Sequence, residues 1–418
     1  MHLTREDRLA WVCVLVLVFI NTVTLLLSNG LSPSFALISD SVTFYDASRN
    51  LYNGLPFSTF PSLPKYAHAA PGYPFFAYLT YFLTGGINPH FTIDVQILLN
   101  PLIIICAFLI VRRYGGNRAG VLAAAFTALL PNLLGYSLLF LSEQLSIVVY
   151  MLALAFLFRA FAGDSLWRFI PAGFVFGLLL YIKPVYQAPV FLVGLLILLL
   201  WKKPFFRRLF AAAILCGVMI ITTVPWLIRN YHIFGRITPM TIAYGEVMHS
   251  GNIWRLPDGF ERYRAIVSRE PDTLRQQGGY AEAEYLEEEL LREDTFKYIR
   301  ENPGVFLTWV MQRAVQIWEL YPGGSPETFG WAITVGSSVY YLILFLGVII
   351  VFFQKPPPVF LWVNIAFIAF IYFFQSTNHA LMRYRLGFEP NLCLLSGYGW
   401  VAFYQRWMNW RKRALKPN

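Results

Sequence analysis

A carboxylate lies just beyond the first long hydrophobic run of the chain, where the polypeptide leaves the apolar stretch. The run ends near Leu27, and Asp40 follows it in a segment that is otherwise rich in aromatic and apolar residues. Such a low-polarity setting raises the pKa of a carboxyl group toward a value that suits a general base. Asp40 is therefore a candidate base for chemistry on a substrate carried by a lipid.

Other ionisable residues also lie at the ends of hydrophobic runs. Glu143 begins one run, Lys183 ends another, Arg229 ends a third, and Arg383 and Arg385 precede the last. A lone acid at a helix start can be a cap, and a lone base near the interface can be an anchor. Guanidinium groups on different spans could instead converge on one phosphate, because their donors form a fixed fork. We therefore take Asp40 and Glu143 as catalytic candidates and the four basic residues as phosphate-binding candidates.

The histidines do not indicate a metal centre. His68, His249 and His379 match no zinc-ligand spacing, and the sequence has no Asp-x-Asp pair. We expect no metal and no other cofactor. Further substrate-pocket candidates, chosen for their polar or aromatic character in the same outer regions, are Tyr45, Asp46, His68, Tyr73, Asn252, His379 and Tyr384.

The composition is that of a polytopic membrane protein. The chain is 57% hydrophobic and only 13% charged, and several apolar runs reach the length of about 20 residues that a membrane span needs. The first run lacks a small-residue cleavage site, so we expect a retained helix rather than a signal peptide. The formal charge of +10 does not require nucleic acid, because the basic residues gather in short loops as the positive-inside rule demands.

These runs predict an all-α bundle of about ten membrane helices. The expected spans are 9–28, 92–111, 119–134, 142–160, 167–183, 185–201, 207–228, 330–353, 358–376 and 388–406. With ten spans, the basic loops and both termini fall on one side, which the positive-inside rule identifies as the cytoplasm. The protein is then a multi-pass cytoplasmic (inner) membrane protein whose candidate site faces the extracytoplasmic side.

Two segments are expected outside. The first, residues 29–91, contains an apolar stretch at 71–84 that is too short to span and predicts a helix at the interface. The second, residues 229–329, predicts a solvated Glu-rich helix over 280–300, a break at 302–304 and an apolar helix over 305–320. The organisation is then a membrane module at 1–228 that includes the catalytic first outer loop, an outer helical loop at 229–329, and membrane helices with a basic tail at 330–418.

The middles of the spans are almost free of charge. A coupled transporter keeps ionisable groups near the midplane, whereas a transferase with a membrane-anchored donor needs them at the headgroup. The pattern favours the transferase. A flippase for lipid-linked sugars, a glycan polymerase or ligase with a lipid-diphosphate donor, and a non-enzymatic scaffold remain as alternatives.

At this point the sequence resembles a known family. Short fragments along the chain are similar, in order, to GT-C glycosyltransferases of the branch that includes protein O-mannosyltransferases and the lipid A aminoarabinose transferase. The fragments are Asp40-Ser with Tyr45, Ala47, Leu51 and Gly54; Pro71-Gly-Tyr-Pro74; Ser142-Glu143; Pro225-Trp226 with Arg229-Asn230 and Phe234-Gly235; Gly251-Asn252; Asn302-Pro303; and Arg383-Tyr-Arg385 with Glu389-Pro390.

The resemblance implies a polyprenyl-phosphate sugar donor. Asp40 matches the first-loop carboxylate that acts on the acceptor, Glu143 an acidic position of the second outer loop, and the three arginines basic positions near the donor phosphate. The chain lacks a Trp-Trp-Asp motif, which argues against an oligosaccharyltransferase. Its first loop reads Ser-Asp-Ser instead of the Asp-Glu pair of eukaryotic protein mannosyltransferases, so a glycolipid or glycan acceptor is expected.

The expected activity is inverting transfer of a hexosyl or pentosyl group to an acceptor hydroxyl. A polyprenyl phosphate is a good leaving group, so the reaction needs one base and cationic groups that stabilise the growing phosphate charge. The expected partners are the polyprenyl-phosphate sugar, membrane lipids and the acceptor, and not nucleic acid.

Overall fold

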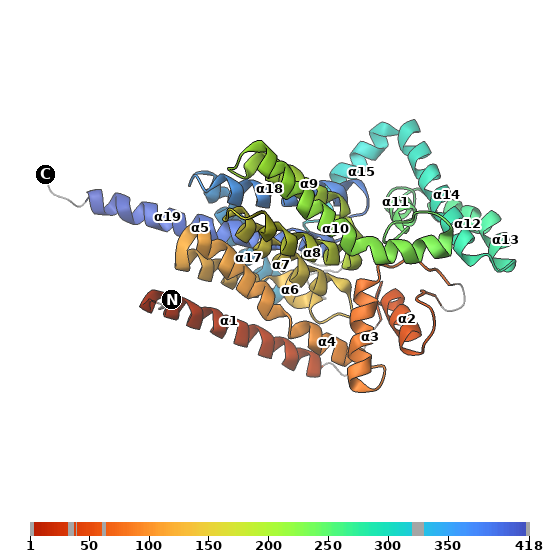
Figure 1. Cartoon of the computed structure of the whole chain (residues 1–418), viewed down its shortest axis with the longest axis horizontal. Helices are drawn as coiled ribbons and strands as arrows, with labels where there is room; N and C mark the ends of the chain where they lie inside the picture. Colours follow the sequence, from red (N-terminus) through yellow and green to blue (C-terminus); the bar gives the residue numbers. More distant parts are fainter. Residues whose placement is uncertain (1–3, 32–36, 39, 61–63, 320–329, 415–418) are drawn as a thin grey trace.

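The structure is a computed structural model that describes residues 4–31, 37–38, 40–60, 64–319 and 330–414. This part of the chain is helical, and its one strand-like pairing is an isolated bridge between Thr59 and Lys65. The long helices form a bundle (Figure 1): α1 (Arg5–Gly30), α5 (Asn100–Ala128), α7 (Ser142–Phe161), α8 (Phe169–Ile182), α9 (Gln187–Leu200), α10 (Phe205–Phe234), α17 (Trp331–Phe352), α18 (Pro358–Thr377) and α19 (Glu389–Ala414).

The bundle confirms the predicted all-α membrane fold. Among the described residues, six helical stretches are long and apolar enough to cross a membrane, and two shorter apolar ones cover 166–182 and 184–200. Each of the ten predicted spans falls largely within helix.

Two predicted span boundaries are wrong. The predicted span 92–111 joins α4 (Pro89–Ile97) to the start of α5, where Pro101 opens a new helix. The predicted span 119–134 runs past Ala128 into the separate short helix α6 (Pro131–Tyr136). Within α5, Gly116 has φ +80° and ψ 179°, a conformation that favours glycine, and it divides the helix into two legs.

Both described ends of the chain lie at one end of the molecule. Figure 1 shows the N- and C-termini on the left and α11–α14 on the right. Asp7 in the first turn of α1 holds the α5 kink through Arg112 Nη2 (2.6 Å) and Asn117 Nδ2 (3.0 Å). The loop predicted to lie on the same side as the N-terminus therefore lies beside it.

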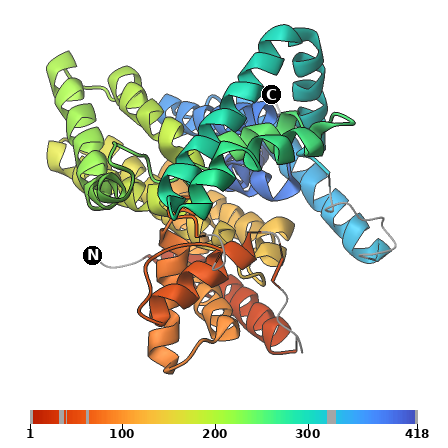
Figure 2. The same ribbon diagram turned by 90° about the vertical axis from the view of Figure 1, so that its right-hand side faces the viewer.

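The other end carries the shorter helices. In the first outer loop these are α2 (Ser41–Tyr52) and α3 (Gly72–Thr84), and α3 is the predicted interface helix. The second outer segment contains α11 (Tyr244–Asn252), α12 (Gly259–Val267), α13 (Glu270–Gln276), α14 (Tyr280–Glu301) and α15 (Pro303–Gln316). Figure 2 looks at this end, with α2 and α3 below the teal helices α14 and α15. The predicted break at 302–304 separates α14 from α15, although α15 ends at Gln316 and position 320 lies outside the described residues.

The prediction that the Glu-rich helix is solvated is wrong for one face of α14. Glu284, Glu287 and Glu288 are 2%, 1% and 6% exposed. Spacings of three and four residues put these side chains on one stripe of the helix, which packs onto the first outer loop.

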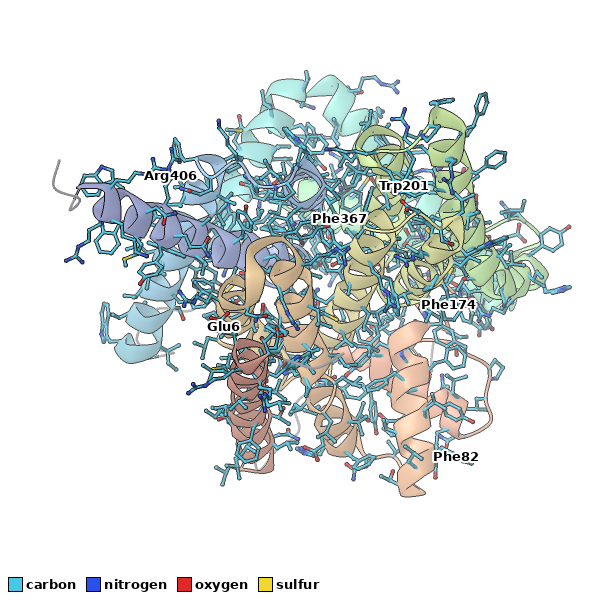
Figure 3. All side chains as sticks on the ribbon, turned by 60° about the vertical axis from the view of Figure 1, so that its left-hand side comes forward. Glu6, Phe82, Phe174, Trp201, Phe367 and Arg406 are labelled. Atoms are coloured by element: carbon cyan, nitrogen blue, oxygen red, sulfur yellow. The ribbon has the colours of Figure 1, made fainter. Side chains whose placement is uncertain are left out.

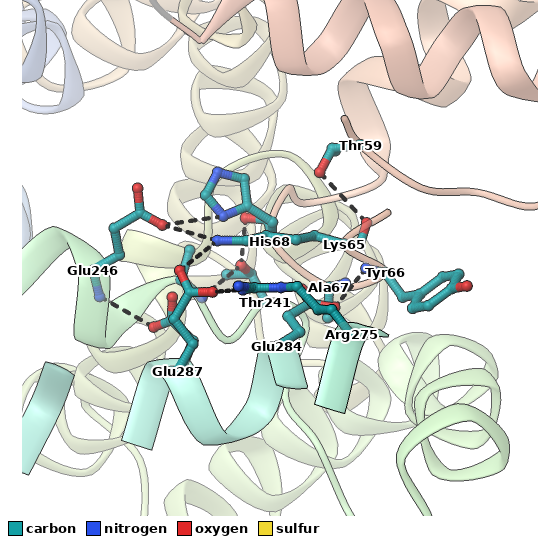
Figure 4. A network of polar contacts seen from close by, with 12 residues as sticks. Thr59, Lys65, Tyr66, Ala67, His68, Thr241, Glu246, Arg275, Glu284 and Glu287 are labelled. Atoms are coloured by element: carbon teal, nitrogen blue, oxygen red, sulfur yellow. Dashed lines mark hydrogen bonds and ion pairs between the residues drawn. The ribbon is translucent and has the colours of Figure 1, made fainter. Parts of the chain in front are cut away.

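A set of ion pairs and hydrogen bonds joins the two outer segments (Figure 4). Lys65 Nζ lies 2.8 Å from Glu287 Oε1 and 3.4 Å from Glu246 Oε2. The backbone N–H groups of Tyr66 and Ala67 donate to the two oxygens of Glu284, at 2.6 and 3.0 Å. Arg275 pairs with Glu287 as well. We refer to Lys65, Glu246, Arg275, Glu284 and Glu287 as the outer clamp, because they fix the loop that leads into His68.

Large apolar side chains fill the interior of the bundle and also cover its exterior. Phe367 is fully buried, whereas Phe174 and Phe82 are 49% and 71% exposed and point outward (Figure 3). Close helix packing is strongest along α19. A Cβ on Gly397 would lie 2.6 Å from the backbone nitrogen of Ala123, so α19 lies almost backbone to backbone on α5.

Candidate functional site

A cavity of about 820 Å³ lies between the bundle and the outer segments. Its walls come from the start of α2, the loop before α3, the start of α7, the end of α8, α11, α14 and the segment between α18 and α19. The predicted site residues that line it are Asp40, His68, Glu143, Lys183, His379, Arg383 and Tyr384.

Asp40 occupies the N-cap position of α2, but its side chain makes no capping hydrogen bond. Its Oδ2 lies 2.8 Å from Arg383 Nη2, and 47% of its side chain is exposed. The carboxylate therefore faces a cation and an open cavity, and the low-polarity setting expected for it stays a prediction. What the position does provide is a carboxylate oxygen at the cavity wall.

Arg383 lies in the short 3-10 segment η3 (Met382–Gly387), and its side chain is 8% exposed. Its Nη2 donates to Tyr384 Oη at 3.2 Å, while its Nε lies 3.9 Å from Glu143 Oε1 and has no hydrogen-bond partner among the described residues. Burial acts to lower the pKa of this guanidinium, but the neighbouring Tyr384, Glu143 and Asp40 raise it by more. The net effect is a pKa above the ordinary value of arginine. Arg383 is thus a permanent cation with an unused donor.

Glu143 begins α7 and is 3% exposed. Its Oε1 accepts from Lys183 Nζ at 2.8 Å, and its Oε2 is buried without a hydrogen-bond partner among the described residues. Lys183 follows the last residue of α8 and precedes Pro184, so the helix ends where the ammonium reaches the cavity. Asp40, Arg383, Glu143 and Lys183 therefore alternate in charge along one wall, and we refer to them as the charge chain.

Two histidines extend the polar lining. The pKa of His379 is lowered to about 4, first by burial and then by Arg383, and its ring lies edge-on to Tyr384. Burial likewise lowers the pKa of His68. Both rings are therefore neutral at physiological pH and can donate or accept one hydrogen bond at each nitrogen according to their tautomer.

Two arginines predicted to bind phosphate are used elsewhere. Arg229 donates to the backbone oxygens of Tyr66 (2.7 Å) and Phe57 (2.9 Å), and its guanidinium stacks 4.4 Å from the Trp226 ring centroid. It holds the first outer loop against α10 and does not line the cavity. Arg385 is 1% exposed and contributes to a buried network described below.

The other pocket candidates do not line the cavity either. Tyr73 is fully buried and donates to Gln96 Oε1 at 2.9 Å. Asn252 is fully buried and donates to Met248 O at 2.9 Å. Asp46 pairs with Arg49 at 3.8 Å, and Tyr45 has the same guanidinium 5.8 Å from its ring. Residues six apart along α2 diverge in direction, so Asp46 does not follow Asp40 into the cavity.

Sequence reasoning missed the contribution of the second outer segment. Tyr244, Glu246, Glu288 and Arg292 line the cavity from α11 and α14. Glu288 and Arg292 belong to the Glu-rich pattern at 280–300, which is equally typical of a solvated helix, and no such pattern surrounds Tyr244 and Glu246.

Three of the described residues could hold a metal ion: His68, Glu246 and Glu288 offer one donor atom each, all within 4.8 Å of one another. Glu288 Oε1 has no hydrogen-bond partner among the described residues, and burial together with Glu246 raises the pKa of this carboxyl to about 8. A set of one imidazole and two carboxylates suits a divalent transition ion. The expectation of a metal-free protein remains a prediction.

The sequence profile of a family described as dolichyl-phosphate-mannose-protein mannosyltransferase matches residues 68–228, which is less than half of the chain. No curated protein sequence gives a significant match.

Solved structures cover nearly the whole chain. One is the archaeal oligosaccharyltransferase AglB from Archaeoglobus fulgidus in complex with an inhibitory peptide and a dolichol-phosphate, with a TM-score of 0.61 at 14% identity. The alignment covers 98% of this chain and 52% of the AglB chain. The apo form of the same organism's oligosaccharyltransferase has a TM-score of 0.60 at 12% identity, with 97% and 52% coverage. ArnT from Cupriavidus metallidurans bound to undecaprenyl phosphate has a TM-score of 0.46 at 14% identity, with 92% and 77% coverage.

This chain therefore spans about half the length of the oligosaccharyltransferases that it matches. Its fold is the GT-C fold that the sequence resemblance predicted.

Proposed function

We propose that the protein is an integral-membrane inverting glycosyltransferase that moves a sugar from a polyprenyl-phosphate donor to a hydroxyl of a glycolipid or glycan. The observation that carries this proposal is the charge chain. Two carboxylates and two cations from four separate segments meet on one wall of a cavity that is large enough for a sugar phosphate.

The cations suit the donor phosphate. Arg383 brings its guanidinium to the cavity wall, and Lys183 adds a point charge on the neighbouring segment. Both stabilise negative charge that grows on the phosphate as the glycosidic bond breaks. In the absence of donor, Asp40 and Glu143 neutralise these cations, so binding exchanges a carboxylate for a phosphate at Arg383.

Asp40 is the proposed base. The acceptor oxygen attacks the anomeric carbon while the bond from that carbon to the phosphate oxygen breaks. The bonding electron pair leaves with the polyprenyl phosphate, and Asp40 takes the hydroxyl proton. Glu143 orients Lys183 and keeps the Arg383 guanidinium in place. Attack opposite the leaving group inverts the anomeric centre.

A lipid monophosphate fits this wall better than a diphosphate. Of the arginines predicted from sequence, only Arg383 lines the cavity, since Arg229 and Arg385 have their donors committed. A donor with a second phosphate would require further cations beside Arg383, and Arg292, which also lines the cavity, lies on α14 and pairs with Glu289 at 3.8 Å. We also propose that the site opens on the extracytoplasmic face, because the charged loops beside both termini indicate the cytoplasm at the other end.

The test is Asp40→Asn in the purified, full-length protein, with Asp46→Asn as the matched control on the same helix. We expect Asp40→Asn to lower turnover about 10³-fold, within the range of general-base catalysis. Donor binding should be at least as tight as in wild type, because Asp40→Asn removes the carboxylate that competes with phosphate for Arg383. Thermal stability should stay close to wild type, and Asp46→Asn should remain active. Near-normal turnover in Asp40→Asn would contradict the assignment.

A further inference from the structure

A second polar network lies behind the charge chain, inside the bundle. Its centre is Glu389, the first residue of α19, which is fully buried. Glu389 Oε1 accepts from Arg385 Nε at 2.5 Å, from Tyr341 Oη at 2.7 Å and from Asn132 Nδ2 at 3.1 Å. Asn132 also lies 3.2 Å from the second carboxylate oxygen. All four side chains are buried, and none of them lines the cavity.

Arg385 ties this centre to still other segments. Its Nη1 donates to the backbone oxygens of Ile317 and Glu319, at 3.2 and 3.1 Å, and its Nη2 donates to Tyr341 Oη at 2.9 Å. The guanidinium also lies 4.5 Å from the Tyr341 ring centroid. The network thus joins α6, α17, η3, α19 and the segment that follows α15.

Two of these segments lead directly to the charge chain. Arg383 and Arg385 belong to the same six-residue segment η3, and Arg385 is two residues further along. Asn132 lies on α6, and the chain passes from α6 through 137–141 to Glu143 at the start of α7. A short 3-10 segment has poor hydrogen-bond geometry of its own, so its position depends on tertiary contacts.

We propose that Glu389, acting through Arg385, is a positioning residue that fixes Arg383 for the donor phosphate. The inference rests on the proposed function, because it assumes that Arg383 contacts phosphate. A buried ion pair of this kind is weak evidence for stability, since well-packed apolar residues often replace it without loss. Its contribution to geometry is therefore the property to test.

The experiment measures binding of farnesyl monophosphate to the full-length protein in detergent. Arg383→Ala should weaken binding about tenfold or more, as the loss of a charge-assisted hydrogen bond predicts. Glu389→Gln should weaken binding to a similar degree. Unchanged binding in Arg383→Ala would contradict the proposed function. Weakened binding in Arg383→Ala together with wild-type binding in Glu389→Gln would contradict only the positioning role.

The double variant Arg383→Ala with Glu389→Gln tests whether the two residues act on the same contact. If Glu389 acts through Arg383, the double variant should bind about as weakly as Arg383→Ala alone. Multiplied losses would show that Glu389 affects binding by another route and would overturn the inference.

Because Glu389→Gln leaves Arg385 buried without its counter-ion, a second variant separates geometry from stability. Arg385→Met with Glu389→Leu removes both charges and should fold with a melting temperature near wild type. Binding should nevertheless stay weakened about tenfold. If this variant recovers both the melting temperature and the binding affinity of wild type, Arg385 and Glu389 serve stability alone and the positioning role is contradicted. Asp7→Asn, which breaks an ion pair at the opposite end of the molecule, is the control for general destabilisation.

Discussion

Two clusters of charge meet at the end of the molecule opposite the two termini (Figure 1), and they differ in how completely their polar atoms are satisfied. In the outer clamp, Glu287 accepts from both Lys65 and Arg275, and Glu284 accepts from two backbone N–H groups. In the charge chain, Glu143 Oε2 and Arg383 Nε are buried without hydrogen-bond partners among the described residues. Both clusters are formed by residues far apart in sequence, and both border the same cavity.

The difference separates a structural from a functional use of similar side chains. Buried polar groups are normally paired, because an unpaired one loses the hydrogen bonds that water supplied. Full pairing in the outer clamp is what holds two segments together. The charge chain combines incomplete pairing with a place on the cavity wall, and we interpret this combination as a sign that a ligand engages these residues.

The largest expected contrast comes from two lysines, each 2.8 Å from a buried glutamate oxygen. Lys65→Met should lower the free energy of unfolding by about 3–5 kcal/mol, because it leaves carboxylates in the outer clamp without their cation. Lys183→Met should cost less stability, since Glu143 keeps Arg383 and faces the cavity. Chemical denaturation of both variants measures the difference.

Donor binding provides the reverse comparison for the same pair. Lys183→Met should weaken binding of the lipid phosphate, whereas folded Lys65→Met should bind as wild type. Equal losses of stability and equal losses of binding in the two variants would remove the distinction between the clusters.

The sequence predicted the bundle because its signals are local. Apolar runs of span length, charges in short loops and the break at Asn302-Pro303-Gly304 each act over a few residues. Asp40, Glu143 and Arg383 were among the site candidates chosen from the sequence, and all three line one cavity.

The rest depends on which way side chains point after packing. Arg383 and Arg385 are equivalent by type and position in the sequence, yet one lines the cavity and the other is inside the bundle. Arg229 matches a phosphate ligand equally well, but the carbonyls that it binds belong to a loop more than 160 residues earlier in the chain. The buried face of α14 likewise needs Lys65 and the loop at 66–67, which no local pattern can connect with it.

The next largest expected effect is the dependence of the free energy of unfolding on pH, which should come from the buried glutamates of α14. Burial raises the pKa of Glu284 to about 7, partly offset by the N–H groups of Tyr66 and Ala67, and raises that of Glu288 to about 8. A carboxyl group whose folded pKa is raised stabilises the fold below its ordinary pKa, and this contribution is lost as the pH rises through the folded value.

We therefore expect stability to fall between about pH 4.5 and pH 8, by about 3 kcal/mol from Glu284 alone at 1.4 kcal/mol for each pKa unit. Glu284→Gln should flatten the profile in that window, and Asp40→Asn should leave its shape unchanged. A profile that rises over the same range in wild type would show that the outer clamp is not held in part by neutral carboxyl groups.

The smallest expected effect is that of metal removal. Glu246 belongs to the outer clamp, yet with His68 and Glu288 it forms a set that could hold a cation at the cavity wall. The proposed transfer requires no metal, because Arg383 and Lys183 supply the positive charge at the leaving phosphate. Turnover and melting temperature of the purified protein should therefore be unchanged after EDTA treatment. Loss of turnover that zinc or manganese restores in wild type, but not in Glu288→Gln, would make this part of the outer end catalytic rather than structural. His68, Glu246 and Glu288 would then belong with the charge chain to the functional cluster.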